Sequence, residues 1–174
     1  MTQNKLLSYV SPEPERQGHA SYTHVHEIIN GLRGQGWQVD LFSPHYDDAE
    51  LPGAWMRIQG IARTMLRAVT APRTRLYYMR WHFAAFPVAL YAKLSGIPVV
   101  IEVNGPMDDL FIAWPSTRRF RGIFEGMMKA QLRWAAGVVA VTDGLNDMCR
   151  AMTDADKIIV TIPNGANTNQ FCPD

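Results

Sequence analysis

One glutamate lies inside one of the most apolar runs of this 174-residue chain. Residues 99–103 read V-V-I-E-V, and their β-branched side chains predict a buried strand that contains Glu102. Gly105 and Pro106 then force a turn, which presents Asn104, and with it Glu102, at the strand's carboxyl end. An asparagine can hydrogen-bond a hydroxyl or polarise a developing charge, but it cannot act as a base at neutral pH. Asn104 is therefore a candidate for contact with a substrate.

Two acidic residues and one arginine extend this set. Asp108 and Asp109 follow the turn, and they either contact a substrate hydroxyl or belong to a solvated loop. Arg80 lies near the end of a predicted strand at 75–81, and an arginine can pair bidentately with phosphate or carboxylate. The alternative for Arg80 is a surface side chain beside a structural tryptophan.

Two further loops precede predicted helices. Gly18 and His19 open one helix, whose free N–H groups and dipole attract anions, although Gly18 is equally explained as a helix-start glycine. The loop has no G-x-G-x-x-G pattern, so a dinucleotide fingerprint is missing. Thr142 either caps the next helix by accepting one of its first N–H groups or contacts a substrate.

The elements that position these residues alternate between strand and helix. Such alternation predicts an α/β fold, a Rossmann-like parallel sheet of about six strands with helices on both faces. Ligands of such sheets bind beyond the carboxyl ends of the strands, here the loops after residues 10, 42, 81, 103, 141 and 162. The predicted strands are 6–10, 37–42, 75–81, 99–103, 138–141 and 158–162, and the predicted helices are 22–32, 56–69, 84–94, 118–136 and 143–152.

Composition restricts the class of protein. Apolar residues make up 47% of the chain and charged residues 19%, which is typical of one globular domain. A formal charge of +1 gives no electrostatic reason to expect nucleic acid as a partner. Cys149 and Cys172 form no C-x-x-C pair and indicate a reducing compartment. The apolar run at 6–10 is too short for a signal peptide or a membrane span.

The most specific pattern closes the chain. After the last predicted strand, residues 162–173 read I-P-N-G-A-N-T-N-Q-F-C-P. This resembles the I-P-N-G-V-D-x-x-x-F-x-P segment of the family-4 glycosyltransferases with the GT-B fold. Two stretches in the middle of the chain, Y-M-R and G-I-P-V-V-I-E-V-N-G, resemble the same family. In that family the closing segment joins two domains, which implies that Asn164 and Gly165 lie at the interdomain junction. Residues 1–174 would then be the N-terminal, acceptor-side Rossmann-like domain, and the C-terminal donor-binding domain would be absent from this chain.

The resemblance also implies an activity. It implies a retaining, hexosyl-type transfer from a nucleotide sugar, such as a UDP- or GDP-sugar, to a glycan or lipid-linked acceptor. It implies no cofactor and no obligate metal, a cytoplasmic location, and no activity for this domain alone. Asn104 matches a position that many relatives fill with histidine near the reacting sugar, so it is the expected catalytic residue. The expected substrate-binding residues are Gly18, His19, Arg80, Glu102, Gly105, Asp108, Asp109 and Thr142.

Two arginine groups and one rival function remain open. One group spans residues 57–75, and the other is Arg118, Arg119 and Arg121 at the start of the predicted helix 118–136. Cations at a helix start oppose the helix dipole, so the second group is not explained by helix stability. Either the two groups dock on the anionic inner face of a membrane or they are solvated. The rival to a transferase is a non-catalytic Rossmann-like module that binds a nucleotide or a protein.

Overall fold

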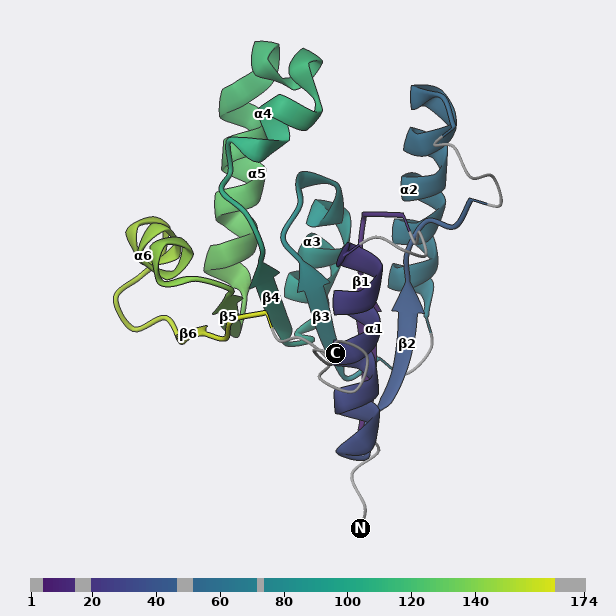
Figure 1. Ribbon diagram of the computed structural model, residues 1–174. Helices are drawn as coiled ribbons and strands as arrows, with labels where there is room; N and C mark the ends of the chain where they lie inside the picture. The colour runs from purple at the N-terminus through teal and green to yellow at the C-terminus, as the bar shows by residue number, and fades with distance from the viewer. Residues whose placement is uncertain (1–4, 15–19, 47–51, 72–73, 165–174) are drawn as a thin grey trace, which may run out of the picture.

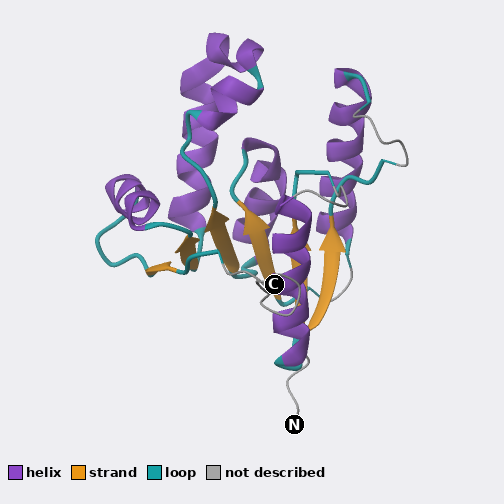
Figure 2. Cartoon of the chain, viewed as in Figure 1, coloured by secondary structure: helices purple, strands orange, loops and turns teal. Residues whose placement is uncertain are grey.

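The computed structural model describes residues 5–14, 20–46, 52–71 and 74–164. They form a parallel sheet flanked by helices (Figures 1 and 2). The six strands stand in the order β2-β1-β3-β4-β5-β6, and every neighbouring pair is parallel. This confirms the predicted fold class. The strands are β1 (Leu6–Val10), β2 (Gln38–Phe42), β3 (Leu76–Arg80), β4 (Val99–Val103), β5 (Gly137–Ala140) and β6 (Ile159–Thr161).

The helices connect successive strands in the predicted order. The α-helices are α1 (Ala20–Gly34), α2 (Ala54–Thr70), α3 (Phe86–Ser95), α4 (Asp109–Ala113), α5 (Arg121–Trp134) and α6 (Asp143–Met152). Two 3₁₀ helices, η1 (Phe83–Ala85) and η2 (Pro115–Phe120), precede α3 and α5. Gly96 ends α3 in the left-handed conformation, with φ of 68°, and its N–H bonds to the carbonyl of Ala92. A glycine adopts that conformation without the steric penalty of a Cβ atom.

The two faces of the sheet carry different numbers of helices. On one face α1 packs over β2, β1 and β3 through the apolar cluster of Leu7, Tyr9, Val25, Ile29 and Val39. On the other face α2, α3, α5 and α6 contribute to a larger cluster with strand residues such as Met79 and Ile101. Side chains alternate along a strand, so Tyr9 and Tyr78 face α1 while Val10 and Met79 face the larger cluster.

The long helix expected at 118–136 is in fact two elements, and this prediction was wrong at its start. Trp114 and Pro115 begin the 3₁₀ helix η2, and α5 starts only at Arg121. Arg118 and Arg119 therefore lie in the last turn of η2, directly before α5. Arg121 is the member of this group in the first turn of α5, where it pairs with Glu125 at 2.6 Å. The short helix α4 was not predicted, because five residues are too few to show a helical period.

The central position of β4 generates a test of the core. Ile101 is fully buried, so Ile101→Ala should lower the free energy of unfolding by about 2–5 kcal/mol, through lost apolar burial and the cavity left behind. Leu94, which is 79% exposed at the end of α3, is the control, and Leu94→Ala should change stability by less than about 0.5 kcal/mol. Urea denaturation of both variants measures the difference. Equal losses would contradict the assigned core.

Candidate active site

A cavity of about 350 Å³ opens at the carboxyl edge of the sheet. It lies where the loops after β1, β3 and β4 meet, since these three strands are neighbours in the sheet. Helix α2 supplies part of one wall, and α4 with its flanking residues supplies another. The polar residues that line it are Glu13, Tyr46, Arg57, Arg80, His82, Asn104 and Asp109.

A buried carboxylate lies beneath this cavity. Glu102 is 1% exposed and accepts hydrogen bonds from His24 Nε2 at 2.6 Å, Asn104 Nδ2 at 2.5 Å and the Tyr9 hydroxyl at 3.4 Å. Burial alone would raise the pKa of Glu102. The hydrogen bond and electrostatic interaction with His24, followed by the hydrogen bonds from Asn104 and Tyr78, outweigh burial and hold the pKa of Glu102 below its usual value of 4.5. Glu102 is therefore an anion near neutral pH.

The two tyrosines beside Glu102 are fixed as hydrogen-bond donors. The Tyr9 and Tyr78 rings stack with centroids 5.1 Å apart, on the face of the sheet that α1 covers. Burial and then the negative charge of Glu102 raise the pKa of both hydroxyls. Both groups consequently stay protonated and cannot serve as bases.

The charge on Glu102 determines how Asn104 is oriented. An ionised carboxylate only accepts hydrogen bonds, so the NH₂ group of the Asn104 amide must face it. The amide oxygen of Asn104 is then left for the cavity, which Asn104 lines. Asn104 can therefore accept a hydrogen bond from a hydroxyl in the cavity.

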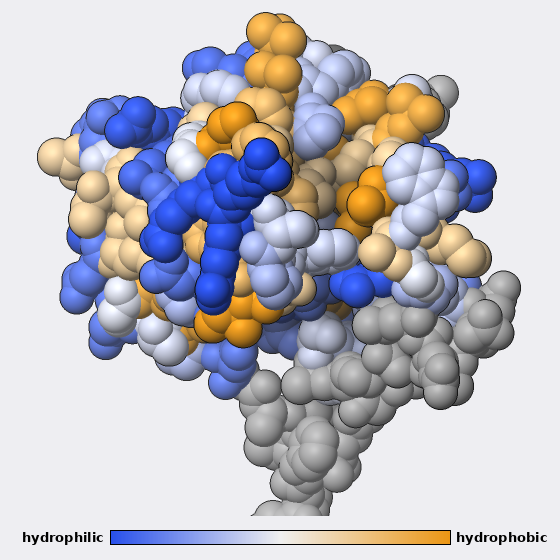
Figure 3. Space-filling model, turned by 90° about the horizontal axis from the view of Figure 1, so that it is seen from above, coloured by the Kyte–Doolittle hydropathy of each residue, from blue (hydrophilic) through white to orange (hydrophobic). Residues whose placement is uncertain are grey.

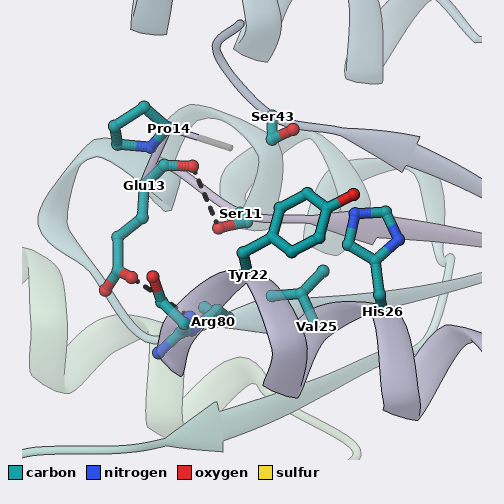
Figure 4. A pocket seen from close by; sticks show the side chains of 9 residues that line it. Ser11, Glu13, Pro14, Tyr22, Val25, His26, Ser43 and Arg80 are labelled. Atoms are coloured by element: carbon teal, nitrogen blue, oxygen red, sulfur yellow. Dashed lines mark hydrogen bonds and ion pairs between the residues drawn. The ribbon is translucent and has the colours of Figure 1, made fainter. Parts of the chain in front are cut away.

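Arg80 is buried rather than on the surface, which excludes the alternative weighed from the sequence. Its exposure is 8%, and its Nη1 atom lies 3.1 Å from Glu13 Oε2 (Figure 4). Arg80 lines both the large cavity and a second pocket of about 10 Å³ beside Tyr22 and Val25 of α1. The guanidinium therefore places a positive charge at the junction of the two spaces.

His82 is a neutral group in the cavity wall. Burial and the nearby charge of Arg80 lower the pKa of His82 from 6.5 to about 4. Its Nδ1 atom accepts a hydrogen bond from the N–H of Ala84 at 3.1 Å, so the proton of the neutral ring is on Nε2. At neutral pH His82 can donate one hydrogen bond but carries no charge.

Arg57 and Trp114 form the upper part of the cavity. The Arg57 guanidinium lies 4.4 Å from the centre of the Trp114 ring, a cation–π contact between α2 and the residue that links α4 to η2. Both residues line the cavity. This contact joins two residues that lie 57 positions apart in the sequence, so no local pattern could have predicted it.

Other predicted site residues fall in several places. Gly105 and Asp109 line the cavity, and a Cβ atom at Gly105 would lie 2.6 Å from Asp109 Oδ2. Asp108 points outward and pairs with Arg121 at 2.8 Å, with both side chains more than half exposed. Thr142 caps α6 by accepting the N–H of Leu145 at 3.3 Å, and it does not line the cavity.

Three predicted positions cannot be placed. Gly18, His19 and Gly165 lie outside the described residues. Asn164 is the last described residue and is exposed. Their expected roles stay predictions.

Sequence reasoning missed His24 and Tyr9, the partners of Glu102. One signal was available: a carboxylate in a strand predicted to be buried requires donors from its neighbours. His24 lies one helical turn before Ile28 on the apolar side of α1, where such a donor could be sought. The sequence does not say which strand or helix is the neighbour.

Within 5–14, 20–46, 52–71 and 74–164, no three His, Cys, Asp or Glu side chains are grouped so that they could hold a metal ion. Among the helices of these same segments, none combines the length and apolar character needed to cross a membrane.

The family model for Glycosyltransferase Family 4 matches residues 22–170. This chain therefore belongs to that family, and it has the fold of the N-terminal domain of a GT-B enzyme. No curated protein matches the chain significantly.

Two solved structures resemble this chain. The glycotransferase of kitacinnamycin matches with a TM-score of 0.52 and 14% identity, over 98% of this chain and 55% of its own. MurG of Acinetobacter baumannii matches with a TM-score of 0.49 and 14% identity, over 94% of this chain and 47% of its own. This chain thus spans about half the length of each protein. The first likeness shows that its sheet has the fold of a glycosyltransferase half.

The lowered pKa of His82 predicts a loss of stability in mild acid. Between pH 6.5 and about 4 the unfolded chain binds a proton at His82 that the folded chain does not. The contribution of His82 to the free energy of unfolding is complete above pH 6.5. This contribution should fall by about 2 kcal/mol between pH 7 and pH 5.

The control is His82→Asn, which keeps a side-chain acceptor for the N–H of Ala84 but does not titrate. Urea denaturation of both proteins at pH 7 and pH 5 measures the difference, and an NMR titration reports the pKa of His82 directly. Parallel pH dependences, or a pKa near 6.5, would show that His82 is solvated instead.

Proposed function

We propose that this chain is the acceptor-side domain of a retaining, hexosyl-type glycosyltransferase, which moves a sugar from a nucleotide sugar to a glycan or lipid-linked acceptor. The observation that carries the proposal is the orientation of Asn104. A buried, ionised Glu102 accepts from the NH₂ group of Asn104, which leaves the amide oxygen available to the cavity of about 350 Å³ that Asn104 lines. That volume is in the range of small-molecule sites.

Three groups at or beside the cavity are poorly suited to act as a protein base. Asn104 cannot accept a full proton, Tyr9 stays protonated, and the low pKa of His82 makes it a weak base. In a front-face retaining transfer, the leaving phosphate oxygen can take the proton of the acceptor hydroxyl. The work left to the protein is to hold that hydroxyl and stabilise developing charge, which Asn104 and the N–H of His82 can do.

A second domain is required to bind the nucleotide part of the donor. The two solved relatives are about twice as long as the region they share with this chain. We propose that a second domain binds most of the donor and meets this domain near Asn164 and Gly165, and that Gly18 and His19 contribute to substrate binding. Residues 1–174 alone should then bind nucleotide sugars weakly and transfer no sugar.

A membrane surface is a suitable neighbour for the rim of the cavity. Apolar side chains are exposed on both helical walls, which rise above the sheet in Figure 1. Figure 3 looks down on this side and shows hydrophobic side chains interspersed with strongly hydrophilic ones. Arg118 and Arg119 add positive charge for anionic lipid headgroups. The exposed apolar residues are Trp55, Met56 and Ile58 of α2 and Ile112, Phe120 and Ile123 of α4, η2 and α5.

The role of Asn104 is tested in a protein that joins this domain to its donor-binding domain. Asn104→Ala should lower turnover by a factor of about 10² or more, because a hydrogen bond to developing charge is lost. The variant should still fold, with a lower melting temperature because the buried Glu102 loses one donor. Asn30→Ala, at an exposed position on α1, is the matched control and should leave both unchanged. Normal turnover by a normally folded Asn104 variant would remove this residue from the site.

Membrane contact is tested by sedimenting the chain with vesicles of phosphatidylcholine and phosphatidylglycerol. Phe120→Ser and Ile123→Ser together should lower the bound fraction about tenfold or more, because two apolar side chains no longer enter the lipid. Leu94→Ser, at a still more exposed position and at the opposite edge of the sheet, should have no effect. Equal losses for both proteins, or equal binding to neutral and anionic vesicles, would argue against this surface.

A further inference from the structure

The buried positive charge of Arg80 is compensated by a carboxylate that is itself partly exposed. A buried guanidinium is unfavourable unless an anion compensates it. Arg80 is 8% exposed, and the carboxylate paired with it in the described part of the chain is Glu13, with Nη1 and Oε2 3.1 Å apart. The side chain of Glu13 is 47% exposed, against 10% for that of Arg80. One partner of this pair is therefore fixed and the other is free to move into solvent.

The geometry of the pair leaves donors unused. Within the described residues, Nη1 of Arg80 finds no hydrogen-bond acceptor in good alignment, although it is buried and close to Glu13. A planar guanidinium forms its strongest pairs when two N–H groups meet two oxygens of one anion. Glu13 compensates the charge of Arg80 without filling that geometry.

The neighbouring carboxylate does not take the place of Glu13. Glu102 is opposite Arg80 in the register of β3 and β4, but it is held by His24, Asn104 and Tyr9. Glu102 is 1% exposed and its donors come from three different elements or loops, so it is a permanent part of the core. Glu13, on the loop after β1, is the exchangeable anion.

The Arg80–Glu13 pair borders two spaces that solutes can enter. Arg80 and Glu13 line both the cavity of about 350 Å³ and the pocket of about 10 Å³ that Ser11, Tyr22 and Ser43 border (Figure 4). The small pocket has room for about one water molecule, so an anion would approach Arg80 from the large cavity. There it competes with the Glu13 carboxylate, whose Oε2 lies 3.1 Å from Arg80 Nη1.

We propose that Arg80 binds an oxyanion of the acceptor substrate, a phosphate or a carboxylate, and that Glu13 occupies this position until the substrate displaces it. The inference rests on the proposed function for the identity of the ligand, but anion exchange at Arg80 does not require glycosyl transfer. Arg57, on the wall of the same cavity, adds a second positive charge that favours an anionic substrate.

The test uses this chain and inorganic phosphate at constant ionic strength, with chloride as the balancing anion. Glu13→Gln removes the competing carboxylate and should bind phosphate about five to ten times more tightly than the unaltered chain. Glu125→Gln makes the same charge change on α5, where Glu125 pairs with Arg121, and should stay within about twofold. Arg80→Gln should lose binding, and thermal unfolding shows whether this variant folds.

A second measurement does not depend on the Arg80 variant. The charge of Arg80 lowers the pKa of His82, so phosphate bound at Arg80 should raise it, and NMR detects this in the unaltered chain. Phosphate affinity that is equal in the Glu13 and Glu125 variants, or a pKa of His82 that phosphate does not change, would overturn the proposal.

Two organic probes distinguish the source of the oxyanion. Geranyl phosphate represents a lipid-linked acceptor, and uridine diphosphate represents the donor. Both probes are titrated against phosphate bound to the Glu13→Gln variant. If geranyl phosphate displaces phosphate at a lower concentration than uridine diphosphate does, the oxyanion at Arg80 belongs to the acceptor. The reverse order overturns that assignment. A protein that joins this domain to its donor-binding domain separates the two proposals. If it transfers sugar but binds no phosphate at Arg80, only the inference about Arg80 is refuted. Phosphate exchange without transfer in that protein would refute the proposed function alone.

Discussion

A buried carboxylate that must be compensated organises the functional edge of this domain. Glu102 lies in the central strand β4 at 1% exposure, so folding is favourable only if donors reach it. His24 reaches it from α1, Tyr9 from β1 and Asn104 from the loop after β4. The same contacts hold α1 against the sheet and set the direction in which Asn104 presents its oxygen.

The strand order determines where the cavity lies, and the charged side chains determine its chemistry. In the order β2-β1-β3-β4-β5-β6, strands that are first, third and fourth in the sequence become neighbours, so their loops converge at one edge. These loops bring Glu13, Arg80 and Asn104 to the same cavity. The carboxyl ends of parallel strands meet there for any sequence with this topology, and the particular side chains decide which ligand the edge can hold.

Two acidic residues with different burial serve different purposes around Arg80. Glu102 is enclosed and saturated with donors, which makes its charge a constant of the folded state. Glu13 is half-exposed and makes one contact of poor alignment with Arg80. Burial therefore separates a structural anion from an exchangeable one, although the two residues are chemically alike. A polar site can combine rigidity and exchange in this way around a single arginine.

The sequence by itself determined the α/β class, six parallel strands, the family, and the candidates Arg80, Glu102 and Asn104, because alternation and turn residues are local properties of a chain. It could not show that 118–136 divides at Arg121, since Phe120, the last residue of η2, falls on the apolar stripe of α5. Tertiary structure alone decided that His24 pairs with Glu102, that Glu13 pairs with Arg80, and that Arg57 stacks on Trp114. These contacts join residues far apart in the chain, and their geometry exists only once the sheet has brought its loops together.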